Sequence, residues 1–114
     1  MGGRRSCLSG YRVMWLYVMF DLPVGTKAER KKATKFRQFL MDQGFEMAQF
    51  SVYLRFAESK EAAETFIARI AAERPNKGKV HIVTITDKQY GNARIFAGSK
   101  REQRPKNPAQ LALF

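Results

Sequence analysis

Asp21 is the residue of this 114-residue sequence that is best placed to do chemistry. It directly follows an apolar run, 13–20, so we expect its carboxylate at the C-terminal end of a buried strand. Proteins often bind Mg²⁺ through one or two carboxylates together with water and substrate phosphates, so one aspartate per chain suffices if two chains associate. The commoner role of such an aspartate is to accept hydrogen bonds from nearby amides in a turn. Position alone leaves both roles open.

The other residues capable of chemistry offer less. His81 falls inside a later apolar segment, where a hydrogen-bonded or solvent-facing imidazole is commoner than a general base. Asp87 ends that segment and is either a second acid in the same site or a turn residue. The single cysteine, Cys7, cannot form an internal disulfide, and together with His81 it supplies too few ligands for zinc. Asp21 is therefore the candidate catalytic residue and metal ligand.

The net charge of +11 points to a polyanionic partner, above all nucleic acid. The excess is concentrated in segment 22–44, where six cations accompany only Glu29 and Asp42, and in segment 99–114. We expect nucleic-acid contacts from cations of the first segment and from one arginine of a later strand. They are Lys27, Arg30, Lys31, Lys35, Arg37 and Arg55. The alternative is that the lysines only solvate the outer face of a helix.

Capping signals predict two helices that position these residues. Thr26 followed by Glu29 is typical of a capping box, and Gly44 marks the end of the same helix. Ser59 is expected to cap a second helix over 60–74. The first helix is apolar on one side and basic on the others, whereas the second has balanced charge and is expected to be structural.

Four segments are expected to be strands: 13–20, 45–50, 51–56 and 79–86. With the two helices they give the order βαββαβ, which indicates an α+β, ferredoxin-like fold with a four-stranded antiparallel sheet and both helices on one face. A short fifth strand is expected within 93–97. The chain divides into an N-terminal extension (1–13), one domain (14–98) and a flexible basic C-terminal tail (99–114).

The first strand is apolar on both faces, although two helices can cover only one face of the sheet. The other face would leave a large exposed apolar patch in a monomer. We therefore expect a homodimer packed sheet to sheet, in which the fifth strand can pair with the partner's sheet edge.

No apolar run approaches the length of roughly 18–20 residues that crosses a bilayer. Arg4 and Arg5 precede an apolar run, but Arg12 interrupts it and no small-residue cleavage site follows. The sequence thus predicts a cytoplasmic protein without a membrane partner.

A string of motifs resembles the CRISPR-associated endoribonucleases of the Cas two family, and most closely its members from type II systems. The resemblance covers about residues 14–98. The motifs are Val18-Met19-Phe20-Asp21-Leu22-Pro23, the basic helix with Lys35-Phe36-Arg37, Gly44-Phe45, Gln49-Phe50-Ser51-Val52-Tyr53 and Thr84-Ile85-Thr86-Asp87-Lys88-Gln89.

The resemblance implies a homodimer that joins the Cas one integrase, in a heterohexamer-type complex, to capture foreign DNA and insert it as new spacers. Asp21 matches the family's metal-binding aspartate. Members are described as Mg²⁺-dependent endonucleases on single-stranded RNA or on DNA, and also as non-catalytic scaffolds for duplex DNA. A toxin-like ribonuclease that acts on messenger RNA is a third alternative. Residues 1–13 precede the usual start of the family and are either a mis-assigned start, with the first strand opening at Met14, or an extra arm.

The chain ends in a segment that resembles the Gln-Leu-x-Leu-Phe peptide by which many bacterial proteins dock on the DNA sliding clamp. Its candidate anchors are Gln110, Leu111, Leu113 and Phe114. Apolar anchors of this kind suit a hydrophobic pocket on a partner. The alternative is that they pack on the protein's own dimer or on the integrase.

Overall fold

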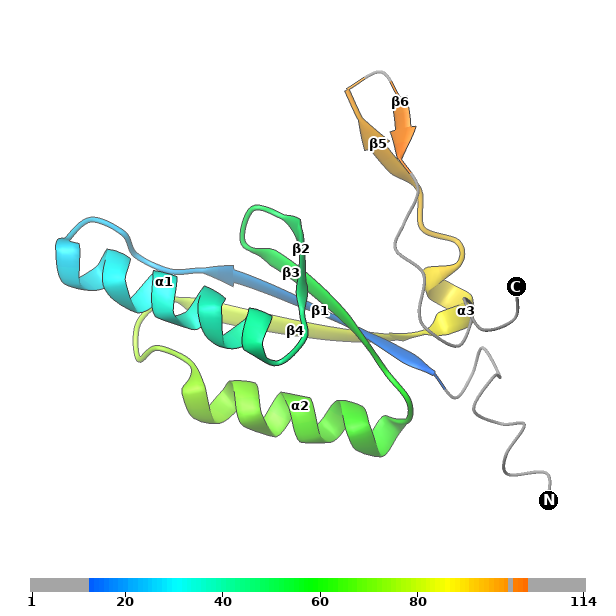
Figure 1. Cartoon of the computed structure of the whole chain (residues 1–114), viewed down its shortest axis with the longest axis horizontal. Helices are drawn as coiled ribbons and strands as arrows, with labels where there is room; N and C mark the ends of the chain where they lie inside the picture. The colour runs from blue at the N-terminus through cyan, green and yellow to red at the C-terminus, as the bar shows by residue number, and fades with distance from the viewer. Residues whose placement is uncertain (1–12, 99, 103–114) are drawn as a thin grey trace.

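The computed structural model describes residues 13–98 and 100–102. Two helices and a four-stranded sheet form its main body (Figure 1). These elements are β1 (Met14–Asp21), α1 (Lys27–Asp42), β2 (Glu46–Gln49), β3 (Val52–Ala57), α2 (Lys60–Glu73) and β4 (Lys79–Thr86). A short helix and a small hairpin follow, namely α3 (Asp87–Tyr90), β5 (Ile95–Ala97) and β6 (Lys100–Glu102).

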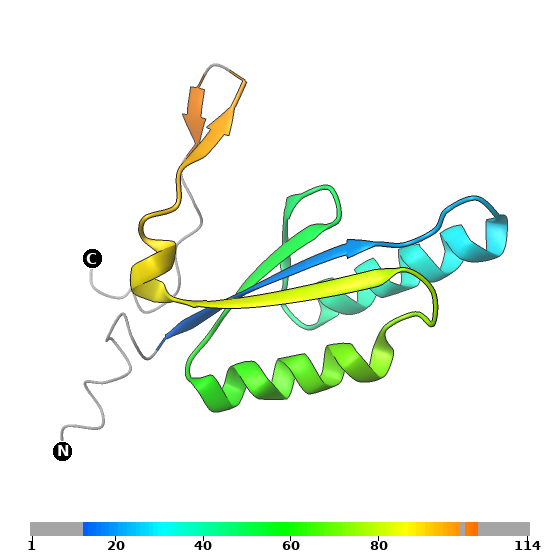
Figure 2. The same cartoon turned by 180° about the vertical axis from the view of Figure 1, so that it is seen from behind.

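The sheet has the order β2-β3-β1-β4, and every neighbouring pair is antiparallel. Both long helices lie on one face of the sheet, which Figures 1 and 2 show from opposite sides. The predicted α+β, ferredoxin-like fold is therefore confirmed. No helix in the described part of the chain is both long enough and apolar enough to serve as a membrane span.

The capping signals act as expected. The Thr26 hydroxyl accepts from the Glu29 amide at 3.1 Å, and the Glu29 carboxylate accepts from the Thr26 amide at 3.0 Å. The Ser59 hydroxyl accepts from the Ala62 amide at 3.1 Å and begins α2. Past the end of α1, Gly44 has a φ of +89°, a conformation that glycine adopts at no steric cost.

Alternate residues of β1 supply the core between sheet and helices. Leu16, Val18 and Phe20 are buried against apolar residues of α1 and α2. The ring of Phe20 meets that of Phe36 edge to face, with centroids 5.2 Å apart. This packing fixes the direction of β1 beneath α1 and so determines where Asp21 lies.

Part of the opposite sheet face is covered by the chain itself. Trp15 is only 3% exposed, because Tyr90 of α3 stacks on it with ring centroids 4.2 Å apart. Trp15 Nε1 also donates to Asp87 Oδ1 at 2.6 Å. The predicted order βαββαβ did not contain α3. This helix covers Trp15 on the sheet face that was expected to stay exposed in a monomer. The capping box between Thr86 and Gln89 begins this helix.

The fifth strand is present as β5, but here it pairs with β6 in a separate two-stranded sheet. This hairpin extends away from the main sheet (Figure 1). β6 falls within the segment predicted as a tail. The sliding-clamp anchors, 110–114, and residues 1–12 of the extension lie outside the described residues.

Candidate metal site and nucleic-acid interface

Asp21 is exposed at the last position of β1, as its place in the sequence predicted. It lines a surface cavity of about 370 Å³. This cavity lies between the last residues of β1, the first residues of β4 and the turn that joins β2 to β3. Polar and aromatic side chains line this cavity beside apolar ones. The lining residues are Met19, Phe20, Asp21, Phe50, Ser51, Val52, Lys79 and His81.

The end of β1 is held from two sides. On one side, Ser51 in the turn after β2 accepts a hydrogen bond from the Phe20 amide at 3.1 Å. On the other, Gly78 approaches so closely that a Cβ atom there would lie 2.5 Å from the Asp21 carbonyl oxygen. The φ of +86° at Gly78 also requires glycine. The backbone of Asp21 is thus fixed between two turns while its carboxylate remains in solvent.

The donor set of one protomer is small. Among the described residues, no group donates a hydrogen bond to the Asp21 carboxylate, and no cluster of three or more His, Cys, Asp or Glu side chains gathers there or elsewhere. A free, exposed carboxylate suits Mg²⁺, which keeps several waters and takes few protein ligands. One chain therefore offers a single carboxylate, that of Asp21, at this cavity.

The two other candidate residues for chemistry, His81 and Asp87, lie far apart in the structure. His81 is exposed and lines the same cavity as Asp21. Asp87 lies beyond the opposite end of β4, whose 8 residues span about 25 Å, and it accepts from the Trp15 indole. Asp87 is therefore a structural residue of α3 and does not belong to the Asp21 site. Lys79, which pairs with Asp21 in the sheet register, joins that site although no sequence signal singled it out.

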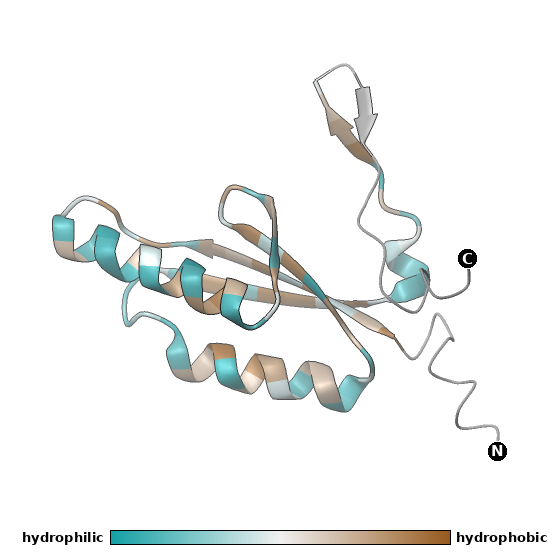
Figure 3. Ribbon diagram, viewed as in Figure 1, coloured by the Kyte–Doolittle hydropathy of each residue, from teal (hydrophilic) through white to brown (hydrophobic). Residues whose placement is uncertain are grey.

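The helix α1 carries six cations and two acids. Much of it is coloured hydrophilic in Figure 3, beside mostly hydrophobic strands. The side chains of Lys27, Arg30, Lys31 and Lys35 are exposed, and that of Arg37 is half-buried. Arg30 Nη1 donates to the Val24 carbonyl at 3.1 Å, which holds this guanidinium at the start of the helix. Five of the six predicted nucleic-acid contacts thus share one helix.

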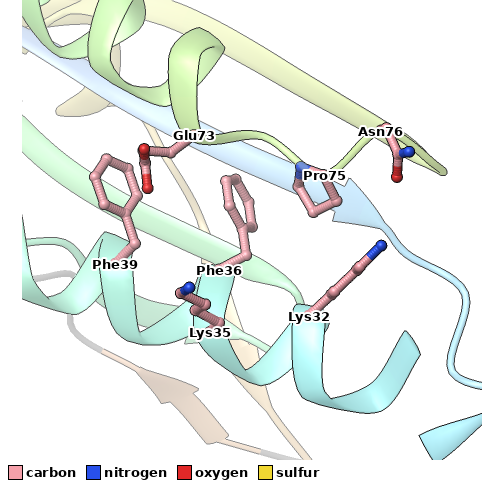
Figure 4. Close-up of a pocket in the computed structure, with 7 residues that line it drawn as sticks. All are labelled: Lys32, Lys35, Phe36, Phe39, Glu73, Pro75 and Asn76. Carbon is pink, nitrogen blue, oxygen red and sulfur yellow. The ribbon is translucent and has the colours of Figure 1, made fainter. Parts of the chain in front are cut away.

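Lys32, which was not among the predicted contacts, extends the basic surface. It lines a cleft of about 190 Å³ between α1 and the loop that follows α2 (Figure 4). In this view Lys32 points toward Pro75 and Asn76, whereas Lys35 lies near Phe39. The carboxylate of Glu73 reduces the positive charge at the Lys35 end of the cleft.

Arg55 lies apart from the other predicted contacts. Its guanidinium carbon is 4.4 Å from the centroid of the Phe66 ring of α2, on the helix side of the sheet. Burial lowers the pKa of Arg55, a nearby Glu58 raises it and Arg69 lowers it. Its Nε is buried without a hydrogen-bond partner among the described residues. This arginine thus packs between β3 and α2, where it contacts the Phe66 ring.

The sheet face away from the helices remains partly apolar beyond α3. A groove of about 440 Å³ runs between this face and the segment that leads into β5. Burial raises the pKa of the Tyr17 phenol here. Apolar residues of the groove include Tyr17, Met19, Met47, Val52, Leu54 and Phe96.

The family model and the relatives that match this chain carry the same family name. Residues 14–93 match the model of the family described as CRISPR associated protein Cas2. A protein of Paracidovorax avenae is 54% identical over 107 residues, which are 94% of this chain and 99% of the relative. A protein of Flavobacterium psychrophilum is 47% identical over 94% of this chain and 93% of its own length. One from Parvibaculum lavamentivorans is 44% identical over 89% of this chain and all of the relative. Each of these relatives is called a CRISPR-associated endoribonuclease Cas2.

Proposed function

Because this chain belongs to the CRISPR-associated Cas2 family, we propose that it works in the adaptation step of CRISPR defence. In this role a homodimer joins the Cas one integrase and holds duplex DNA during the insertion of new spacers. The observation that carries the proposal is the basic surface of α1, where exposed cations project from one helix with few acids among them. Such a surface binds the phosphate backbone of nucleic acid without reading its sequence.

The homodimer forms through the sheet face that the two long helices leave open. Val83 is 43% exposed there, and the neighbouring groove is lined by apolar side chains of β1 and β3. Contact between two such faces removes apolar surface from water. A two-fold arrangement also brings a second carboxylate to the site, which one chain leaves incomplete.

The same dimer is proposed to have Mg²⁺-dependent endonuclease activity on single-stranded RNA or on DNA, as the names of the relatives suggest for RNA. Asp21 of both chains would hold the ion. When bound, Mg²⁺ supplies an activated water and neutralises the charge that develops on the phosphate. Lys79 and His81, on the rim of the same cavity, are placed to bind the phosphodiester that enters it.

The nuclease and scaffold roles are separated by the variant Asp21→Asn, which keeps the shape of the side chain but removes its charge. Cleavage of single-stranded RNA in Mg²⁺ is expected to fall by about 100-fold or more. Spacer integration by the complex with the Cas one integrase is expected to continue. The matched control is Asp42→Asn, at an exposed acid of α1 whose carboxylate bonds to Gln38.

Two results would contradict the proposal. Unchanged cleavage by Asp21→Asn would remove this carboxylate from the nuclease site. Loss of integration by the same variant, with the control unaffected, would show that the scaffold role is not independent of Asp21.

A further inference from the structure

Phe50 is the most exposed large apolar side chain in the part of the chain that the structure describes, at 79% of its surface. Single exposed apolar residues are common and need no function. The position of Phe50 is unusual because its ring lines the same cavity as the Asp21 carboxylate. An aromatic ring is thus presented to solvent beside the candidate metal ligand.

The turn that carries Phe50 is fixed relative to Asp21. The next residue, Ser51, has a φ of +64°, a left-handed conformation that costs energy for a residue other than glycine. The Ser51 carbonyl accepts from the amide of Phe20, the residue before Asp21. The ring and the carboxylate are therefore held on two segments joined directly by a backbone hydrogen bond.

A cation covers one face of the ring. The guanidinium carbon of Arg37 lies 5.3 Å from the ring centroid, within the range of a cation–π contact. The large exposed fraction of Phe50 indicates that the opposite face of the ring is open to solvent. Lys79 and His81 line the cavity on the β4 side. The cations Arg37 and Lys79 therefore bring positive charge to both sides of an open aromatic ring.

We propose that Phe50 is a stacking site for an unpaired base of a single-stranded nucleic acid, and that it places the adjoining phosphate near Asp21. Aromatic rings flanked by cations bind single strands in this way, because every base has a π-face and every linkage a negative charge. Neighbouring base pairs cover that face in a duplex, so the site takes unpaired nucleotides only. The inference deepens the proposed function, on which it rests, by naming what the cavity binds.

The test measures binding without cleavage. Full-length protein in EDTA is titrated into a labelled single-stranded RNA, and fluorescence anisotropy gives the dissociation constant. A second series of RNAs carries one abasic position, moved stepwise along the strand. A DNA of the same sequence shows which type of strand the site takes.

Phe50→Ala is expected to weaken binding of the intact strand by about 5- to 100-fold. One abasic position is expected to weaken the binding of the wild type by a similar factor, and Phe50→Ala then to cause no further loss on that strand. Phe50→Trp retains affinity because it keeps an aromatic face. The control is Val24→Ala, in the loop before α1, at a residue that is 51% exposed but not aromatic and does not line the cavity; it leaves affinity unchanged.

Three results would overturn the inference: no loss with Phe50→Ala, an equal loss on intact and abasic strands, or a change of oligomeric state by light scattering. The last would show that Phe50 packs against the second copy of the chain. None of these depends on metal. A variant of Asp21 that still cleaves would therefore refute the nuclease site and leave the base-stacking result standing.

Discussion

Individual backbone positions determine where the Asp21 carboxylate lies. The strongest constraint is at Gly78, which combines a left-handed φ with a carbonyl oxygen where a Cβ would have to fit. The atom in the way belongs to the backbone of Asp21, so rotation of a side chain cannot relieve the contact. A substitution at Gly78 therefore acts on the candidate site as well as on stability.

We expect Gly78→Ala to lower the free energy of unfolding by about 2–4 kcal/mol, because strain and overlap add. Urea denaturation monitored by circular dichroism measures this. The control is Gly98→Ala, since Gly98 also has a positive φ but nothing within 4 Å of the added Cβ. Its expected cost is about 1 kcal/mol, from the backbone conformation alone. Equal costs at both positions would show that the close approach to Asp21 is unimportant.

The sequence identified Asp21 at the residue scale because a carboxylate at the end of a buried apolar run is a visible pattern. It did not identify Phe50, which was included in the expected strand 45–50. The turn at Phe50 and Ser51 depends on a hydrogen bond to β1, and such a contact between distant segments leaves no local signal. The same reason explains why Lys79 and Lys32 were missed.

At the scale of elements, α1 carries the basic surface and α2 is nearly neutral in charge. Charge reversal on α1 by the double variant Lys31→Glu, Lys35→Glu is therefore expected to weaken duplex DNA binding. The dependence of log K on log salt concentration should also flatten, by roughly one unit for each phosphate that the variant no longer neutralises. Titrations at several salt concentrations measure both effects. Both side chains are exposed, so folding should be retained.

Lys60→Glu, at an exposed cation of α2, is the matched control for that experiment. It also changes the net charge but lies outside the proposed DNA surface. If it reduced affinity and salt dependence as much per charge as the α1 variant, general electrostatic attraction would explain the binding, and α1 would have no special role.

The long helices were predictable from their caps and apolar stripes, β1 from its continuous apolar run and β3 from its alternating apolar residues. The helix α3 was not predicted, since four residues are too few to show a helical period. Its capping box between Thr86 and Gln89 was present in the sequence as a local signal. The role of α3 becomes evident only from the stacking of Tyr90 on Trp15 in the folded chain.

At the scale of the whole molecule, the open sheet face predicts association. Val83→Asp introduces a charge at an exposed position of this face, so the folded protomer tolerates it, whereas a charge buried between two sheets is costly. We expect light scattering at micromolar concentration to show a dimer for the wild type and a monomer for this variant. The control is Val24→Asp, which is 51% exposed in the loop before α1 and should remain dimeric. A monomeric wild type would contradict the sheet-to-sheet dimer.

The C-terminal segment supplies a second prediction at this scale. We propose that 110–114 docks on the DNA sliding clamp, as its similarity to a clamp-binding peptide suggests. Purified clamp should retain the full-length protein, whereas a chain that ends at Pro108 should not be retained. Equal retention of the two proteins would refute the proposal and favour packing of the tail on the dimer or on the integrase.

The chain contains a single tryptophan, and its indole lies beneath α3. The fluorescence emission of Trp15 therefore depends on whether α3 stays packed on the sheet. Release of α3 would expose the indole to water and shift its spectrum to the red, even if the helices and the rest of the sheet were unchanged. Intrinsic fluorescence can thus show, without an added dye, whether binding of a partner or of nucleic acid displaces α3, which leads into the hairpin.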